Sequence, residues 1–149
     1  MKDNLLTDDS VEHLTSLSKK KPPLQTLDVS KNQLSAKGIV RILKEGACEK
    51  LEIQENRVGI HALIQIAEVI GTKGCQCLEL NMGKQVPKQR KKDEETIKRS
   101  ISMRGFSQLV KLDISYMNMS NSCVLELLSQ INSSNLPIRD LDLSGNEVC

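Results

Sequence analysis

The chain has 149 residues, a length typical of one domain, and a formal net charge of only +2. It holds one Phe, one Tyr and no Trp, which argues against a nucleic-acid site built from exposed stacking rings. No apolar run approaches the ~20 residues that cross a bilayer, and no secretion signal is visible at the N-terminus. With an odd number of five cysteines, these features predict a cytoplasmic or nuclear protein.

The first predicted element is a helix that follows Asp8 and Asp9, either of which can cap it. Its apolar stripe, at helical spacing, consists of Val11, Leu14 and Leu17. Two prolines at 22–23 stop the helix, because proline cannot continue one.

A short pattern follows and recurs along the chain. From Leu24 it reads L-x-x-L-x-L-x-x-N-x-L, in which the apolar alternation predicts a short strand and Asn32 a turn. The five copies begin at Leu24, Cys48, Cys75, Leu109 and Ile138. In the third and fourth copies Gly83 and Met117 stand at the Asn slot, so we expect the row of turn asparagines to break there.

Helices are predicted between the copies, at residues 35–45, about 60–70, about 87–103 and about 121–131. Their core candidates are Ile39, Ile42, Leu43, Leu63, Ile66, Ala67, Ile70, Ile97, Ile101, Val124, Leu127, Leu128 and Ile131. The third repeat carries a basic insertion at about 84–105, because residues 84–104 hold eight Lys or Arg against three Asp or Glu. Its segment 84–92 can be a nuclear import signal or a plain solvated insertion.

The recurring motif resembles the leucine-rich repeat family, and the helical second half of each repeat resembles its ribonuclease-inhibitor-like branch. The resemblance implies an α/β solenoid, a horseshoe segment with short parallel strands on the concave face and helices on the convex face. We expect residues 1–149 to form a single domain of about five rungs. Since both ends fall inside repeats, we also expect it to be a fragment of a longer array in a larger protein.

In this arrangement two inward columns fill the core. The first is Leu24, Cys48, Cys75, Leu109 and Ile138, and the second is Leu27, Leu51, Leu78, Leu112 and Leu141. Alternation then exposes a row of carboxylates on the concave face: Asp28, Glu52, Glu79, Asp113 and Asp142. Tyr116 lies at the edge of that face, and with the carboxylates it completes the predicted partner-binding residues. Because Asp is common at this slot in the family, a purely structural role for the row is an open alternative.

The sequence therefore predicts a non-catalytic scaffold that binds a protein partner, which can be a basic one, on its concave face. We predict no catalytic residue, cofactor or metal ion. Cys75 is expected to point inward and Cys77 outward, and His13 and His61 lack a neighbouring nucleophile. Two alternatives are a GTPase-regulatory module similar to the leucine-rich activator of the Ran GTPase, and a sensing array of an innate immune receptor or pathogen effector. The partner's identity and the oligomeric state are not readable from the residues.

Overall fold

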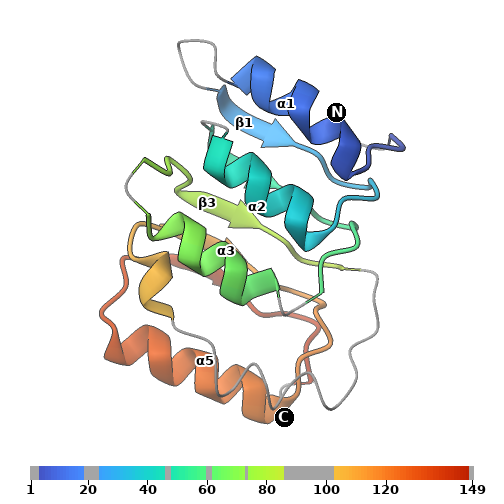
Figure 1. Ribbon diagram of the computed structural model, residues 1–149. Helices are drawn as coiled ribbons and strands as arrows, with labels where there is room; N and C mark the ends of the chain where they lie inside the picture. Colours follow the sequence, from blue (N-terminus) through green and yellow to red (C-terminus); the bar gives the residue numbers. More distant parts are fainter. Residues whose placement is uncertain are drawn as a thin grey trace.

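The computed structural model describes residues 4–18, 24–45, 48–59, 62–72, 74–85 and 103–147. Strands and helices alternate along the chain and form two layers (Figure 1). One layer is a parallel sheet in the order β1-β2-β3-β4-β5. Its strands are β1 (Leu24–Asp28), β2 (Cys48–Glu52), β3 (Glu79–Asn81), β4 (Lys111–Asp113) and β5 (Asp140–Asp142).

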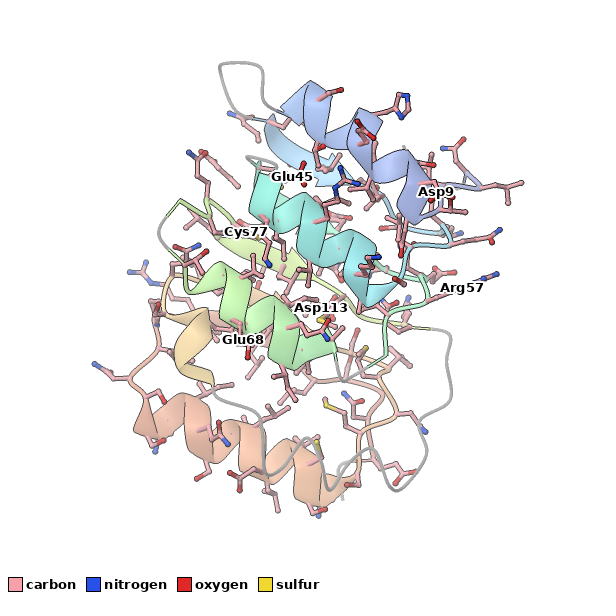
Figure 2. All side chains as sticks on the ribbon, viewed as in Figure 1. Asp9, Glu45, Arg57, Glu68, Cys77 and Asp113 are labelled. Atoms are coloured by element: carbon pink, nitrogen blue, oxygen red, sulfur yellow. The ribbon has the colours of Figure 1, made fainter. Side chains whose placement is uncertain are left out.

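The helices of the described ranges line up along one side of this sheet, and none of them covers its other side (Figure 1). They are η1 (Asp8–Ser10), α1 (Val11–Ser18), α2 (Ala36–Glu45), α3 (Ala62–Ile70), η2 (Met103–Phe106) and α5 (Asn121–Ser133). The side chains between the layers form one apolar core (Figure 2). We call the uncovered side of the sheet the open face, because it corresponds to the predicted concave face. No helix in the described ranges is long and apolar enough to cross a membrane.

The helix predictions are confirmed for three segments, because α2, α3 and α5 bury the expected apolar positions. The confirmed core residues are Ile39, Ile42, Leu43, Leu63, Ile66, Ala67, Ile70, Val124 and Leu127. Leu128 is a correction, with 38% of its surface exposed: it lies one turn from Leu125, which is 58% exposed, so this side of α5 faces solvent. The helix predicted at about 87–103 falls largely outside the described residues, as do the prolines at 22–23 and the side chain of Leu17.

The first helical segment is capped differently from our prediction. Thr7 precedes η1, and its backbone N–H donates to the hydroxyl of Ser10. The Asp8 carboxylate instead accepts hydrogen bonds from the backbone N–H and the hydroxyl of Ser35, the residue just before α2. Asp8 therefore links neighbouring repeats, and Thr7 takes the capping position.

The third repeat is shifted by two residues from the predicted register. Leu80 pairs with Leu51 on one side and Leu112 on the other, whereas Leu78 is 40% exposed. Cys77 is 1% exposed and takes the inward place that we predicted for Cys75, which is only partly buried. A two-residue shift keeps the same side chains on the same face of a strand, so alternation alone does not distinguish the two registers.

Burial and hydrogen bonding explain why the shifted register is the stable one. It brings Met82 fully into the core, at the position of Ile53 and Ile114 in the neighbouring repeats. It also puts Gln85, and not Gly83, at the Asn slot. The Gln85 amide donates to the carbonyls of Ile53 and Met82 at 2.8 and 3.0 Å. The predicted break at the third copy is therefore wrong, while Met117 does occupy the slot of the fourth.

The inward columns are confirmed for the inner strands, with Cys77 in place of Cys75 and Leu80 in place of Leu78, whereas Leu24 is 36% exposed. The first runs through Leu24, Cys48, Cys77, Leu109 and Ile138, and the second through Leu27, Leu51, Leu80, Leu112 and Leu141. Leu24 and Ile138 are less buried than the residues between them, because β1 and β5 are the edge strands of the sheet.

Candidate functional site

Two rows of side chains cross the strands on the open face. The first, which we call the mixed row, contains Thr26, Lys50, Glu79, Lys111 and Asp140. The second, which we call the acidic row, contains Asp28, Glu52, Asn81, Asp113 and Asp142. The two rows lie on either side of the buried column that contains Leu51 and Leu80, so they run parallel across the sheet.

The position of Glu79 corrects the predicted carboxylate row. The two-residue shift moves Glu79 to the mixed row, beside Lys50 and Lys111, and puts Asn81 in its place. Asp28, Glu52, Asp113 and Asp142 do share one row, as predicted. The row is therefore interrupted by a neutral amide between Glu52 and Asp113.

The mixed row is largely neutralised by its own members. Residues of this row that lie opposite each other on adjacent strands have opposite charges. These pairs are Lys50 with Glu79, Glu79 with Lys111, and Lys111 with Asp140. Lys111 forms an ion pair with Asp140, and Lys50 forms one with Glu52 at 2.8 Å. Hydrogen bonds to these carboxylates, and then their charges, raise the pKa of both lysines. Such pairs leave little net field along this row.

The acidic row has a structural role at four of its five positions. Asp28, Asp113 and Asp142 each accept a hydrogen bond at 2.9 Å from the backbone N–H two residues ahead. Asn81 accepts the equivalent bond from Gly83 at 3.4 Å. The bond that Asp142 accepts from the backbone N–H of Ser144 is the first cause of the lowered pKa of this carboxyl group. A carboxylate oxygen at this slot therefore closes the turn that follows each strand.

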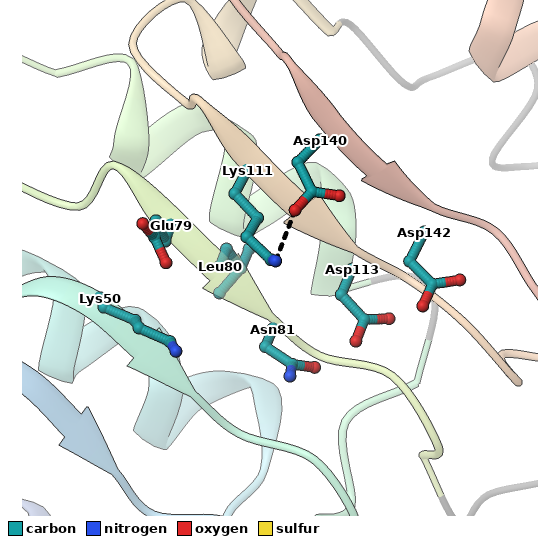
Figure 3. Close-up of a pocket in the computed structure, with 8 residues that line it drawn as sticks. All are labelled: Lys50, Glu79, Leu80, Asn81, Lys111, Asp113, Asp140 and Asp142. Atoms are coloured by element: carbon teal, nitrogen blue, oxygen red, sulfur yellow. Dashed lines mark hydrogen bonds and ion pairs between the residues drawn. The ribbon is translucent and has the colours of Figure 1, made fainter.

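Asp113, which is only 9% exposed, and the exposed Asp142 are two adjacent carboxylates of the acidic row. They are direct register partners on β4 and β5, and the nearby Lys111 is engaged by Asp140 (Figure 3). They help to line a hollow of about 190 Å³. Its lining consists of Lys50, Glu79, Leu80, Asn81, Lys111, Asp113, Asp140 and Asp142. Four carboxylates against two lysines give this hollow a formal charge of −2. Since a carboxylate offers several acceptor positions, the backbone bond to Asp113 and the backbone and side-chain bonds of Ser144 to Asp142 leave both carboxylates able to accept more.

Tyr116 lies in the turn after β4, next to the end of the acidic row. Its ring is 54% exposed and packs against Gly145, where an added Cβ would come within 2.3 Å of the ring. The ammonium of Lys84 lies 5.7 Å from the ring centroid, within the range of a cation–π contact. Tyr116 and Gly145 both have positive φ angles, of 52° and 68°, at equivalent places in their turns. The packing holds this aromatic ring at the rim of the open face.

Metal-binding clusters and reactive thiols can be assessed among the described residues. No group of three or more His, Cys, Asp or Glu among them could hold a metal ion. Burial raises the pKa of the Cys48 thiol to about 11 and also raises that of Cys77, so neither is a ready nucleophile. His13 is exposed on α1, and His61 lies outside the described residues.

Comparison with known proteins adds one finding to this geometry. The family model described as Leucine Rich repeat matches residues 20–43, a range that holds β1 and most of α2. The fold is of the leucine-rich-repeat type. No curated protein matches the chain. The leucine-rich-repeat fold is associated with protein interaction, and the open face is the side of this one that its helices leave accessible.

Sequence reasoning missed two residues of this site, Asn81 and Gln85. The signal for Gln85 was present, because it follows Met82 by three residues, just as Asn32 follows Val29. Gln carries the same amide as Asn on a side chain that is longer by one methylene, so it can serve the same slot. Had Gln85 been taken as the turn amide, Asn81 would have entered the acidic row.

Proposed function

We propose that the chain is a non-catalytic protein-interaction module whose open face binds a partner through basic side chains. The observation that carries this proposal is the pairing of Asp113 with Asp142 in a hollow of net negative charge. The predicted partner-binding residues Asp28, Glu52, Asp142, Asp113 and Tyr116 lie along or beside one row. Glu79 contributes to the same hollow from the mixed row.

The form of the surface favours a protein partner over a small molecule. The hollow follows several strands and is open to solvent, so it suits side chains that project from another surface. Its charge opposes phosphate groups, which makes a nucleic-acid backbone a poor occupant. An exposed Tyr at the rim supports a protein interface, because Tyr is enriched among the residues that dominate such interfaces.

We also propose that the described chain is one domain of the ribonuclease-inhibitor-like branch. A single five-stranded sheet and a single core cluster support one domain. Helices α2, α3 and α5 in the second halves of their repeats support the branch. Crystallographic measurement of the repeat geometry tests the branch, since a different geometry would exclude it.

The test of the binding proposal removes charge without removing the turn bond. In the double variant Asp113→Asn, Asp142→Asn each amide oxygen can still accept the backbone N–H, as Asn81 does. The probe is a fluorescein-labelled peptide of lysines, with a glutamate peptide for comparison, followed by fluorescence anisotropy at low and high salt. We expect roughly fivefold weaker binding of the lysine peptide at low salt, and a smaller difference at high salt.

The matched control is Glu12→Gln, Glu68→Gln, which removes the same charge from exposed positions of α1 and α3. Equal losses in the two double variants would mean that only total charge matters, and the proposed site would be wrong.

A further inference from the structure

A pair of exposed apolar residues borders the open face on the side away from the acidic row. Leu78 and Val110 are 40% and 37% exposed and directly precede β3 and β4. The backbone N–H of Val110 donates to the carbonyl of Leu78 at 2.8 Å, so the two residues are neighbours across the strands. We call this pair the apolar ledge.

The ledge is specific to the middle of the sheet. The neighbouring residue on the β2 side is Glu49, whose carbonyl accepts from Leu78 N–H, and on the β5 side Arg139, whose N–H donates to Val110. The other repeats carry polar or charged residues at this position, Gln25, Glu49 and Arg139, and only these two carry solvent-exposed aliphatic ones. Leu78 and Val110 are not needed to fill the core, because Leu80 and Leu112 occupy the inward column of their strands.

The ledge belongs to the same accessible surface as the two charged rows. Leu78 lines a second hollow of about 200 Å³ together with Thr26, Lys50 and Glu79 of the mixed row. From Val110 through β4 the order is Val110, Lys111, Leu112, Asp113, so the ledge and the acidic row are three positions apart along the chain. At about 3.3 Å per residue, the two strips run parallel across the sheet roughly 10 Å apart.

This spacing limits which partner segment can use both strips at once. A helix with its side chains is about 10–12 Å across, so one that lies across the strands covers both strips along its length. An extended segment that runs along β4 repeats its facing side chains every ~7 Å, which matches 10 Å poorly. The mixed row between the strips holds two lysines and two carboxylates and so has no net formal charge, which suits polar or small residues at the centre of such a helix face.

We propose that the open face binds an amphipathic helical segment of a partner. Apolar side chains of this helix pack on Leu78 and Val110, and its Lys or Arg side chains meet the exposed Asp142 beside the largely buried Asp113. This inference rests on the proposed function and adds the form of the partner and its orientation across the sheet. Charge complementarity with the acidic pair fixes which flank of the helix faces which strip.

The test compares two labelled peptides of identical composition. One places leucines and lysines on adjacent flanks of a helix, and the other has the same residues in scrambled order, so both have the same charge. We expect the amphipathic peptide to bind the full chain roughly tenfold more tightly in fluorescence anisotropy. Its circular dichroism should show helix gained on binding. Equal affinities for the two peptides would overturn the proposal.

Variants of the chain then assign the difference to the ledge. Leu78→Gln with Val110→Thr should remove most of the preference for the amphipathic peptide and leave the salt dependence unchanged. Leu78→Ala with Val110→Ala provides a second pair, in case the polar residues disturb the strands. The matched control is Leu128→Gln, because Leu128 on α5 is 38% exposed, close to the value for Leu78.

The two proposals fail in different ways. If Asp113→Asn, Asp142→Asn weakens binding while the ledge variants do not, the charged site stands and the helical inference is wrong. If the charge variant has no effect, the proposed function itself is wrong. A loss on Leu128→Gln equal to that of the ledge variants would also overturn the helical inference.

Discussion

Gln85 and Asn56 are joined across adjacent repeats, because the backbone N–H of Asn56 donates to Oε1 of Gln85 at 3.2 Å. The N–H of Val58 donates to the same oxygen, also at 3.2 Å. Gln85 thus serves the turn of the preceding repeat in the way that Asn56 serves Leu34, whose N–H it accepts at 3.0 Å. The carbonyl of Ile53 accepts from both amides, which makes the row continuous at this point.

We expect Gln85→Ala to lower the free energy of unfolding by about 1–3 kcal/mol, because it leaves several backbone groups of two turns without their partner. Urea unfolding followed by circular dichroism measures this value. The control is Gln65→Ala on the exposed side of α3, which should change stability by no more than about 0.5 kcal/mol. Equal effects of the two substitutions would contradict the structural role of Gln85.

Asn81→Asp should strengthen binding of the lysine peptide at low salt by roughly two- to threefold. The new carboxylate would stand between Glu52 and Asp113 and make the acidic row continuous, while its oxygen can keep the bond from Gly83. Fluorescence anisotropy measures the change. Gln65→Glu adds the same charge on α3 and should leave the affinity nearly unaltered, so a matching gain there would count against the row as the binding site.

Gly105→Ala should destabilise the protein strongly, by about 3 kcal/mol or more. A Cβ on Gly105 would come within 2.2 Å of the Ala67 carbonyl oxygen, at the contact of η2 with α3, and backbone atoms there cannot move aside alone. Gly59→Ala is the matched control, because nothing lies within 4 Å of its added Cβ. Thermal unfolding of the two variants measures the difference, and similar midpoints would contradict the close approach.

Gly145→Ala should displace the ring of Tyr116. The added methyl group would meet ring atoms at 2.3–2.7 Å, and φ of +68° is unfavourable for alanine as well. Because Tyr116 is the single Tyr and the chain has no Trp, its fluorescence reports this contact directly. In a chain that already carries Tyr116→Ala, the further substitution Gly145→Ala should cost less stability than it does in the parent chain. Only the cost of the unfavourable backbone angle remains there. Additive effects would show that the ring does not constrain Gly145.

Stability should fall as the pH rises above about 9, and Cys48 should contribute to that fall. Burial raises the pKa of its thiol from 9.0 to about 11, so the unfolded chain loses this proton first. The folded state therefore holds more protons between these two values, and the free energy of unfolding decreases with pH there. Cys48→Val should flatten this alkaline slope in urea titrations at several pH values. An unchanged slope would mean that the thiol does not titrate in this way.

The repeat, the strands and the helices α2, α3 and α5 were predictable from local patterns. Apolar spacing specified which residues of these helices face the core, because a helix with one apolar stripe has one way to bury it. The same holds for Leu27 and Leu51, which lie in copies of the motif that keep the turn Asn. These features depend on neighbours within a few positions of the chain, so they can be read from the residues in order.

The register of the third repeat was decided only by tertiary structure. Two alignments kept the same face of β3 inward, and the one that forms also buries Cys77 and Met82 and brings Gln85 to the backbone of the preceding repeat. That choice moves Glu79 out of the acidic row and Asn81 into it. It also exposes Leu78 beside Val110. The physical reason is that a two-residue shift does not change which face of the strand is apolar. The two registers differ in free energy only through the contacts that the strand makes with the strands on either side.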